Sequence, residues 1–389
     1  MNRPPVDRNV WYLGWVSFFT DLASSVVTTL LPLFVVYVLD QGVDKLGVVI
    51  AVATFVSYAL RILFGYVSQR WRLVKPLLVA GYLISALTKP LLALVDSYKG
   101  VALMRAVERM GKAVRSAPKD VLISHYGASR QKGRTFGFHK TLDIAGELAG
   151  ALAVFAMLSW WLLDERSIRW MFAATLLPGL IGIGILVLKV QDVPAPPPQQ
   201  PRARSVWDPR DRQLLPMLLV YFLSLVFMFS DAFMIVRAKE LGMGDALIPL
   251  LVIVSTLTQT LTSYYSGVLG DRWGSPRMLL YALLAAIASV FLLHIGWVWP
   301  GFALFGLFTV VSLNALRAWI ADRAHSQAFV YGLFYGGVAL SSALGALVVG
   351  QIWERWGFDA VAQFSLGGLI LLSLWQATRC GSCAVDQRR

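Results

Sequence analysis

The sequence predicts an all-α integral membrane protein with about twelve transmembrane helices. The chain of 389 residues is 57% hydrophobic and only 15% charged, and its mean hydropathy is +0.63. An ordinary soluble domain is about 45–50% apolar and about 25% charged. A water-soluble core cannot hide this much apolar surface, so the composition implies contact with lipid. The apolar residues also gather in runs of about 20, the length that a helix needs to cross a bilayer.

Twelve such runs, each bounded by charged or turn residues, can be read along the chain. They occupy residues 11–39, 46–68, 76–95, 100–122, 134–158, 169–188, 214–236, 247–269, 277–295, 299–320, 327–351 and 357–378. The first run exceeds the apolar core of a signal peptide, and no small-residue cleavage site follows it. We therefore expect the first run to persist as a membrane helix.

Lysine and arginine collect on one side of the predicted spans, for example at Arg70, Lys132 and Arg272. Basic connections stay in the cytoplasm, so we expect both termini there. The bias also accounts for the formal net charge of +13 without a nucleic-acid partner. We expect a monomer in the lipid bilayer of a bacterial-type inner (plasma) membrane.

A proline-rich stretch at residues 193–201 separates six predicted spans from the next six. Such a stretch favours extended polyproline II and cannot build a core. The expected organisation is an N-terminal six-helix bundle at 1–190, a cytoplasmic linker at 191–212, and a C-terminal six-helix bundle with a short tail at 213–389.

Four segments of the first half recur, in the same order, in the second half. The pairs are Phe19-Thr20-Asp21 with Phe229-Ser230-Asp231, Gly65 to Trp71 with Gly267 to Trp273, Arg115 and Asp120 with Arg317 and Asp322, and Phe136-Gly137 and Gly150 with Tyr331-Gly332 and Gly345. The offset drifts by only a few residues, as differing loop lengths would produce. The halves are therefore expected to be two copies of one bundle.

The pattern Gly267-x-x-Gly270-Asp271-Arg272-x-Gly274-x-x-Arg277 resembles the signature loop between helices 8 and 9 of major facilitator superfamily (MFS) transporters. The resemblance covers nearly the whole chain. It implies two pseudo-symmetric six-helix bundles, secondary transport, and a central cavity lined in the first half by helices 1, 4 and 5. It also implies a gating loop formed by Gly267, Gly270, Asp271, Arg272 and Arg277. In the equivalent first-half loop, Gln69 stands where an acidic residue is usual.

Ionisable residues mark one face of the fourth and of the fifth predicted span. At about 100° per residue, the first set falls within roughly 120° and the second within roughly 60°. The sets are Arg105, Glu108, Arg109, Lys112 and Arg115, and Lys140, Asp143 and Glu147, with His139 at the edge. Each charge at membrane depth costs roughly 2.5–3.5 kcal/mol. Both faces must therefore meet protein or a watery cavity, although helix-joining ion pairs would explain them too.

These charges suggest a site for a small anionic or zwitterionic solute, coupled to protons. The expected substrate-binding residues are Arg105, Arg109, Lys112 and Lys140, with Gln259 and Tyr335 from the second half. The expected proton-coupling residues are Asp21, Glu108, Asp143 and Glu147. In the second half the positions answering Arg109, Lys112, Lys140, Asp143 and Glu147 are Val311, Asn314, Tyr335, Val338 and Ser342. A charged wall in one half would then face a neutral polar wall in the other.

Three other functions stay open at this point. A multidrug efflux pump would prefer an aromatic cavity with a lone carboxylate, and a non-transporting sensor or scaffold would need the carboxylates only for folding. An integral-membrane enzyme is disfavoured, because the four histidines are scattered and no nucleophile motif, metal spacing or P-loop is present. Cys380 and Cys383 have the spacing of half a metal site without a second pair. We therefore expect no cofactor and no metal.

Overall fold

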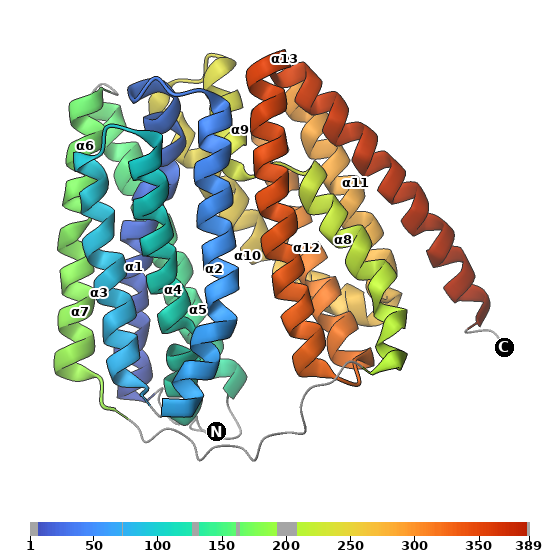
Figure 1. Cartoon of the computed structure of the whole chain (residues 1–389), viewed down its shortest axis with the longest axis horizontal. Coiled ribbons are helices and arrows are strands. Elements are labelled where there is room, and N and C mark those ends of the chain that lie inside the picture. The colour runs from blue at the N-terminus through green and yellow to red at the C-terminus, as the bar shows by residue number, and fades with distance from the viewer. Residues whose placement is uncertain (1–6, 72, 127–131, 161–163, 193–207, 387–389) are drawn as a thin grey trace. The chain divides into compact units, whose positions relative to one another are not determined.

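A computed structural model describes residues 7–71, 73–126, 132–160, 164–192 and 208–386 of the chain. In this part of the chain the regular structure is helical and contains no strand, which confirms the all-α prediction. The proline-rich stretch lies outside the described residues, and so do the side chains of Cys380 and Cys383. Figure 1 shows the helices in chain order.

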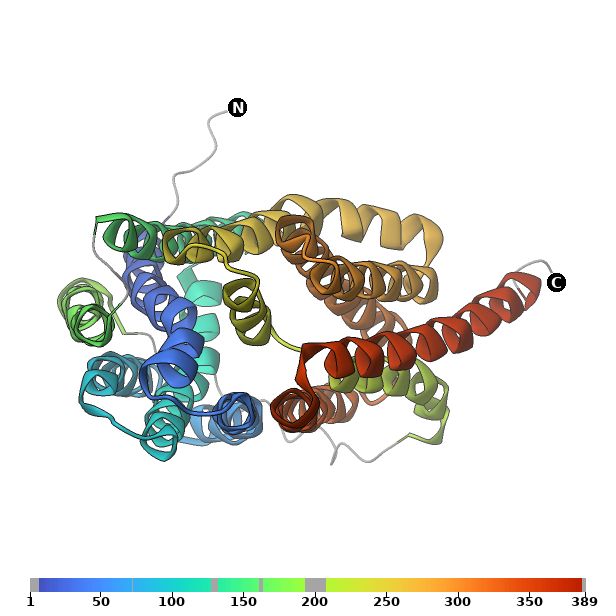
Figure 2. The ribbon, with the colours of Figure 1, turned by 90° about the horizontal axis from the view of Figure 1, so that it is seen from above.

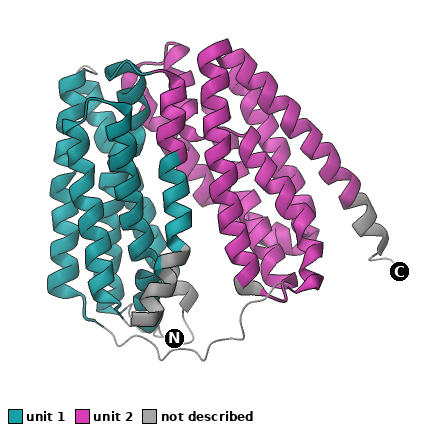
Figure 3. Ribbon diagram, in the orientation of Figure 1, with its two compact units in different colours: residues 1–41, 52–201 teal, residues 42–51, 202–389 magenta. Residues whose placement is uncertain are grey.

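The helices divide into two compact units, coloured separately in Figure 3. The first unit holds residues 1–41 and 52–201, and the second holds residues 42–51 and 202–389. The first turns of one helix, α2 (Val43–Trp71), therefore belong to the second unit. There the Val43 backbone N–H donates a hydrogen bond of 2.8 Å to the Glu354 carboxylate.

The first unit is built around the helix α1. Its elements are α1 (Arg8–Leu33) with the π-helical turn η1 (Phe34–Val38), the rest of α2, α3 (Lys75–Leu91) with η2 (Leu92–Leu94), α4 (Tyr98–Tyr126), α5 (Lys132–Trp160), α6 (Glu165–Ala174) and α7 (Leu176–Lys189). Helix α1 packs against α5 and α7, and α3 packs against α4 and α7. Figure 2 shows these helices nearly end on. The span that includes α1 is the most buried of the candidate spans.

The second unit is likewise a bundle of helices. Its elements are η3 (Pro209–Leu214), α8 (Leu215–Phe227), α9 (Asp231–Glu240), η4 (Asp245–Leu247), α10 (Ile248–Trp273), α11 (Ser275–His294), α12 (Val298–Arg323) and α13 (Gln327–Asp386). The predicted seventh span is broken at residues 228–230, which separate α8 from α9. Helix α13 contains a sharp bend, visible in Figure 1, because Gly357 has a φ of 77° that side chains disfavour.

The spans agree closely with the sequence prediction. Ten segments of the described chain are long and apolar enough to cross a membrane. One of them, Phe329–Arg379, has 51 residues, and a single crossing needs only about 20. Helix α4 is absent from the ten although it has 29 residues, because its charges lower its hydropathy. The total of about twelve crossings stays a prediction.

Close contacts between glycine and backbone join the first and fifth helices of each half. In the first unit, side chains at Gly146 and Gly150 would overlap the carbonyls of Phe18 and Leu22 on α1. In the second unit, a Cβ at Gly345 would lie 2.5 Å from the carbonyl oxygen of Leu225 on α8. Small residues let membrane helices approach closely, so the predicted repeat has a physical counterpart in the packing.

We expect Gly146→Ala to lower the thermal unfolding temperature of the purified protein, because the added methyl group has no room between α1 and α5. Overpacking of this kind costs about 1–3 kcal/mol. Gly137→Ala on the same helix is the matched control, since no heavy atom lies within 4 Å of a Cβ built there. Equal unfolding temperatures for the two variants would contradict the packing seam.

Candidate functional site

A cavity of about 180 Å³ lies inside the first unit, between α1, α3, α4 and α5. Its wall combines ionisable groups with hydroxyl groups and contains almost no apolar side chain. The lining residues are Ser17, Thr20, Asp21, Tyr82, Lys112, Arg115, Ser116, Lys119, Lys140, Asp143 and Glu147. A polar cavity at membrane depth is a functional candidate, because ionisable groups there are costly to maintain.

Four cationic side chains face three carboxylates in this cavity. The cations are Lys112, Arg115, Lys119 and Lys140, and the carboxylates are Asp21, Asp143 and Glu147. With each group in its ordinary charge state at neutral pH, one positive charge remains in excess. The cavity is therefore suited to a solute that carries a negative group, with carboxylates available for a positive group on the same solute.

Asp143 lies at the centre of the cationic groups, yet it makes no tight ion pair with them. Its Oδ2 is 3.9 Å from the Nζ of Lys119 on α4 and 3.9 Å from the Nζ of Lys140 on α5. Its Oδ1 is 3.4 Å from Nδ1 of His139. These separations exceed the usual 2.7–2.9 Å of a charge-assisted hydrogen bond. Both lysines can therefore turn to another anion at small cost in lost bonding.

The hydroxyl side of the cavity joins α1 to α3. The hydroxyls of Ser17 and Tyr82 are 3.3 Å apart, and the guanidinium of Arg115 lies over the Tyr82 ring at 4.3 Å from its centroid. Helices α3 and α4 come this close because Gly81 and Gly111 face each other, each with its Cβ position 2.7 Å from the carbonyl oxygen of the other. The aromatic face stabilises the buried cation without neutralising it.

A second charged cluster lies nearer the start of α4 and does not line the cavity. Arg105 donates a hydrogen bond of 2.6 Å to Glu108, and both side chains are about 4% exposed. Arg109 lies 3.7 Å from the same Glu108 oxygen. The Glu108 carboxylate thus has its cationic partners within α4, as expected of an ion pair that stabilises the helix.

Lys89 on α3 is a buried charge near the cavity that the sequence analysis missed. It is 1% exposed, and its ammonium donates to the carbonyl oxygen of Thr20 at 3.3 Å. Glu108 and Asp21 are the carboxylates that attract it. The sequence could have identified Lys89, because it lies inside the apolar run 76–95. A charged residue within a membrane span is a functional candidate, as the charges on α4 are.

The structure thus brings together five of the predicted residues and separates others. Asp21, Lys112, Lys140, Asp143 and Glu147 line one cavity. Arg105, Glu108 and Arg109 form the neighbouring cluster. The cavity also contains Ser17, Thr20, Tyr82, Ser116 and Lys119, for which the charge pattern gave no substrate role.

The predicted polar wall of the second half lies on α10 and α13. The side-chain amide of Gln259 donates to the Ser255 hydroxyl at 3.3 Å, and the Tyr335 ring packs against Phe334 and Tyr331. Hydroxyls of Thr258 and Thr262 donate to backbone carbonyls one turn earlier. These threonines are bonded within their own helix, as hydroxyl residues in membrane helices often are.

The predicted gating loop is a tight turn between two helices. Gly267, Gly270, Asp271 and Arg272 belong to the last turns of α10, and Arg277 belongs to the first turn of α11. Gly274 joins the helices with a φ of 81°, a conformation that glycine adopts without strain. The backbone conformation of the turn therefore explains why the motif has a glycine at position 274.

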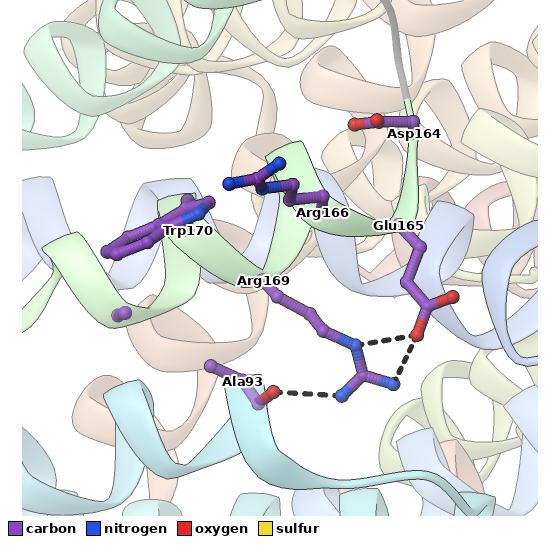
Figure 4. A pocket seen from close by; sticks show the side chains of 7 residues that line it. Ala93, Asp164, Glu165, Arg166, Arg169 and Trp170 are labelled. Carbon is purple, nitrogen blue, oxygen red and sulfur yellow. Dashed lines mark hydrogen bonds and ion pairs between the residues drawn. The ribbon is translucent and has the colours of Figure 1, made fainter.

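A larger, open pocket of about 560 Å³ lies at the start of α6, and Figure 4 shows its lining. Arg169 donates to the carbonyl oxygens of Ala93 and Val95 and pairs with Glu165, which fixes the η2 turn against α6. Hydrogen bonds from Ser167 hold the pKa of the exposed Asp164 below its usual range, in accord with its position as the N-cap of α6. The contacts of Asp164, Glu165 and Arg169 are thus those of residues that hold the start of α6 in place.

A helical membrane protein with an internal charged cavity has the architecture of a transport protein. Comparison with known proteins gives the family. The chain belongs to the Major Facilitator Superfamily, whose family model matches residues 13–346. It is a multi-pass membrane transporter, not an enzyme.

Similar proteins agree with this assignment. An uncharacterized MFS-type transporter of Methanocaldococcus jannaschii is 28% identical over 370 residues, which cover 91% of this chain and 90% of that protein. A POT family transporter in complex with a thioalcohol-conjugated peptide superposes with a TM-score of 0.79 at 11% identity, over 95% of this chain and 96% of the other. The nucleoside transporter NupG superposes with a TM-score of 0.74 at 14% identity, over 96% and 99%. The two structures share the fold with this chain.

We expect Glu108→Gln to destabilise the protein strongly, because it removes the buried carboxylate that Arg105 and Arg109 share. Breaking such a pair costs on the order of 3–5 kcal/mol. The control is Glu165→Gln, which removes an exposed i,i+4 pair with Arg169 and should cost about 0–1 kcal/mol. Denaturant or thermal unfolding in detergent measures both. A Glu108→Gln variant as stable as the control would show that the α4 pair is dispensable for folding.

Proposed function

We propose that this transporter moves a small anionic or zwitterionic organic solute by alternating access and couples the movement to protons. The observation that carries the proposal is the cavity of the first unit, where four cations face three carboxylates around loosely paired Asp143. An anionic group of the solute would bind Lys112, Lys119 and Lys140. An ammonium group, where the solute has one, would bind Asp21 or Glu147.

Coupling follows from competition for the lysines. In the structure the ammonium groups of Lys119 and Lys140 each lie 3.9 Å from Asp143 Oδ2. A bound anion draws these groups toward itself and leaves Asp143 less compensated. A less compensated carboxylate favours a proton on itself or on a neighbouring titratable group. Solute and proton therefore stabilise each other's binding, which is the thermodynamic requirement for coupled transport.

The second half would complete the site with neutral groups. Gln259 offers an amide and Tyr335 a phenol, and both suit hydrogen bonding to a polar solute. Two half-sites of different character would allow the solute to be held by charge in one half and oriented by neutral contacts in the other. Residues at a repeat interface near the midplane form the substrate site in many repeat-built transporters.

The first test is thermal stabilisation of the purified protein by citrate, glutamate, glycine and tetraphenylphosphonium. We expect stabilisation by the anionic or zwitterionic solutes, rising to about 2.7 kcal/mol at 100 times Kd. Lys112→Gln and Lys140→Gln should reduce it, whereas Lys99→Gln, an exposed lysine outside the cavity, should not. Stabilisation by tetraphenylphosphonium alone, untouched by the lysine variants, would instead support drug efflux.

The second test measures coupling in proteoliposomes with the solute that stabilises best. Wild-type protein should accumulate that solute when the compartment from which it is taken is acidified. Asp143→Asn should lose accumulation but keep solute exchange at equal pH, because the binding cations remain. Accumulation that is unchanged in Asp143→Asn would contradict proton coupling at this residue. A protein that binds the solute but moves none of it would be a sensor or scaffold.

A further inference from the structure

His139 lies directly behind Asp143, on the protein side of the cavity wall. It is 3% exposed and does not line the cavity. Its two ring nitrogens meet two lining residues, because Nδ1 is 3.4 Å from Asp143 Oδ1 and Nε2 is 3.0 Å from Ser17 Oγ. Ser17 continues to the hydroxyl of Tyr82 at 3.3 Å. The imidazole thus connects a carboxylate and a pair of hydroxyls from the buried side.

Charged groups from three helices act on this ring. Burial disfavours a positive imidazole most, and Lys119 on α4 and Lys140 on α5 oppose it as well, whereas Asp21 on α1 and Asp143 on α5 favour it. Tyr82 on α3 is the remaining titratable group of the chain of contacts. The proton content of the ring therefore depends on whether the two lysines face Asp143 or another anion. Histidine is suited to such a dependence because small changes in its surroundings change its charge near neutral pH.

We propose that His139 takes up the coupled proton when an anion engages Lys119 and Lys140. The inference rests on the proposed function and names the place of the proton within it. One proton from the cavity water binds the ring nitrogen that carries none, and neutral imidazole becomes imidazolium. No other bond forms or breaks. The ring gains one positive charge as the solute brings one negative charge, so the loaded site keeps the net charge of the empty one.

The buried position of the ring gives this proton store an advantage over the carboxylates. Asp21, Asp143 and Glu147 line the cavity, so their protons exchange with whichever solution the cavity meets. A proton on His139 is shielded by Asp143 and Ser17 and stays there as long as the anion holds the lysines. Release of the anion returns the lysines to Asp143 and expels the proton. Protonation of the His139 ring would thus depend more on whether an anion is bound than on direct contact of the ring with water.

The test uses the ring nitrogens of His139 as the probe, and it needs no solute. The chain has only four histidines, so nitrogen NMR of protein labelled at histidine can resolve each ring, with His139→Gln providing the assignment. Lys140→Met, at an exposed side chain, and Lys119→Met imitate lysines that have turned away. Each should raise the pH of ring protonation by about one unit or more, and Asp143→Asn should lower it by a similar amount.

A second histidine provides the matched control. His294 Nδ1 lies 3.4 Å from Asp359 Oδ1 in the second unit, the same separation as in the cavity pair. The cavity variants should leave the nitrogen NMR signals of His294 unchanged, because this histidine lies in the second unit. A His139 ring that stays neutral between about pH 5 and pH 8 in both lysine variants, or ignores Asp143→Asn, would overturn the proposal and leave His139 a structural residue.

The two proposals can fail separately. Absence of a stabilising anion together with a lysine-dependent His139 ring would reject the substrate class and keep the proton site. A stabilising anion with an unresponsive ring would keep the substrate class and place the proton elsewhere. In the coupling assay, His139→Gln should retain solute exchange and lose accumulation driven by acid. Unchanged unfolding temperature in His139→Gln would show that this loss does not come from misfolding.

Discussion

The free energy cost of placing charge at membrane depth governs the first half of this protein. Helix α4 carries enough charge to be excluded from the apolar spans, so it is stable only where other groups meet its charged face. Arg105 and Glu108 meet each other, and Arg115 meets the Tyr82 ring. The contact between Arg115 and Tyr82 needs α3 within backbone distance of α4, which Gly81 and Gly111 permit. The close packing of α3 against α4 is therefore also what stabilises part of the charge on α4.

The fold was largely predictable because the bilayer imposes a length on each apolar run. Helix ends extend a few residues beyond the predicted spans, since polar residues flank the apolar core without ending the helix. The break between α8 and α9 was not predictable, because Met228 and Phe229 are apolar and continue the hydropathy signal across it. The bend at Gly357 separates the two predicted runs 327–351 and 357–378. Hydropathy measures burial in lipid and is insensitive to local backbone geometry.

The cavity was predictable only in part. Angular spacing along α5 correctly placed Lys140, Asp143 and Glu147 on one face, because helical geometry alone fixes that relation. It could not show that Glu108 pairs with Arg105 and does not line the cavity. Glu108 shares a face of α4 with the cavity residues and differs from them only in its position along the helix axis. Nor could it pair His139 with Ser17, 122 residues apart in the chain. Contacts between helices depend on their rotation and height, which a single sequence leaves open.

Comparison of the two halves separates scaffold from chemistry. The glycine contacts between the first and fifth helices recur, at Gly150 in one half and Gly345 in the other, so the repeat retains what brings backbones together. Asp231 and Arg317 keep the charges of Asp21 and Arg115, but Val338 and Ser342 stand where Asp143 and Glu147 stand in the first half. One half therefore builds the same helix contacts without carboxylates at these positions. Charges kept in one copy at a cost of roughly 2.5–3.5 kcal/mol each, and unnecessary for packing in the other, are best explained by the solute and the proton that the cavity would bind.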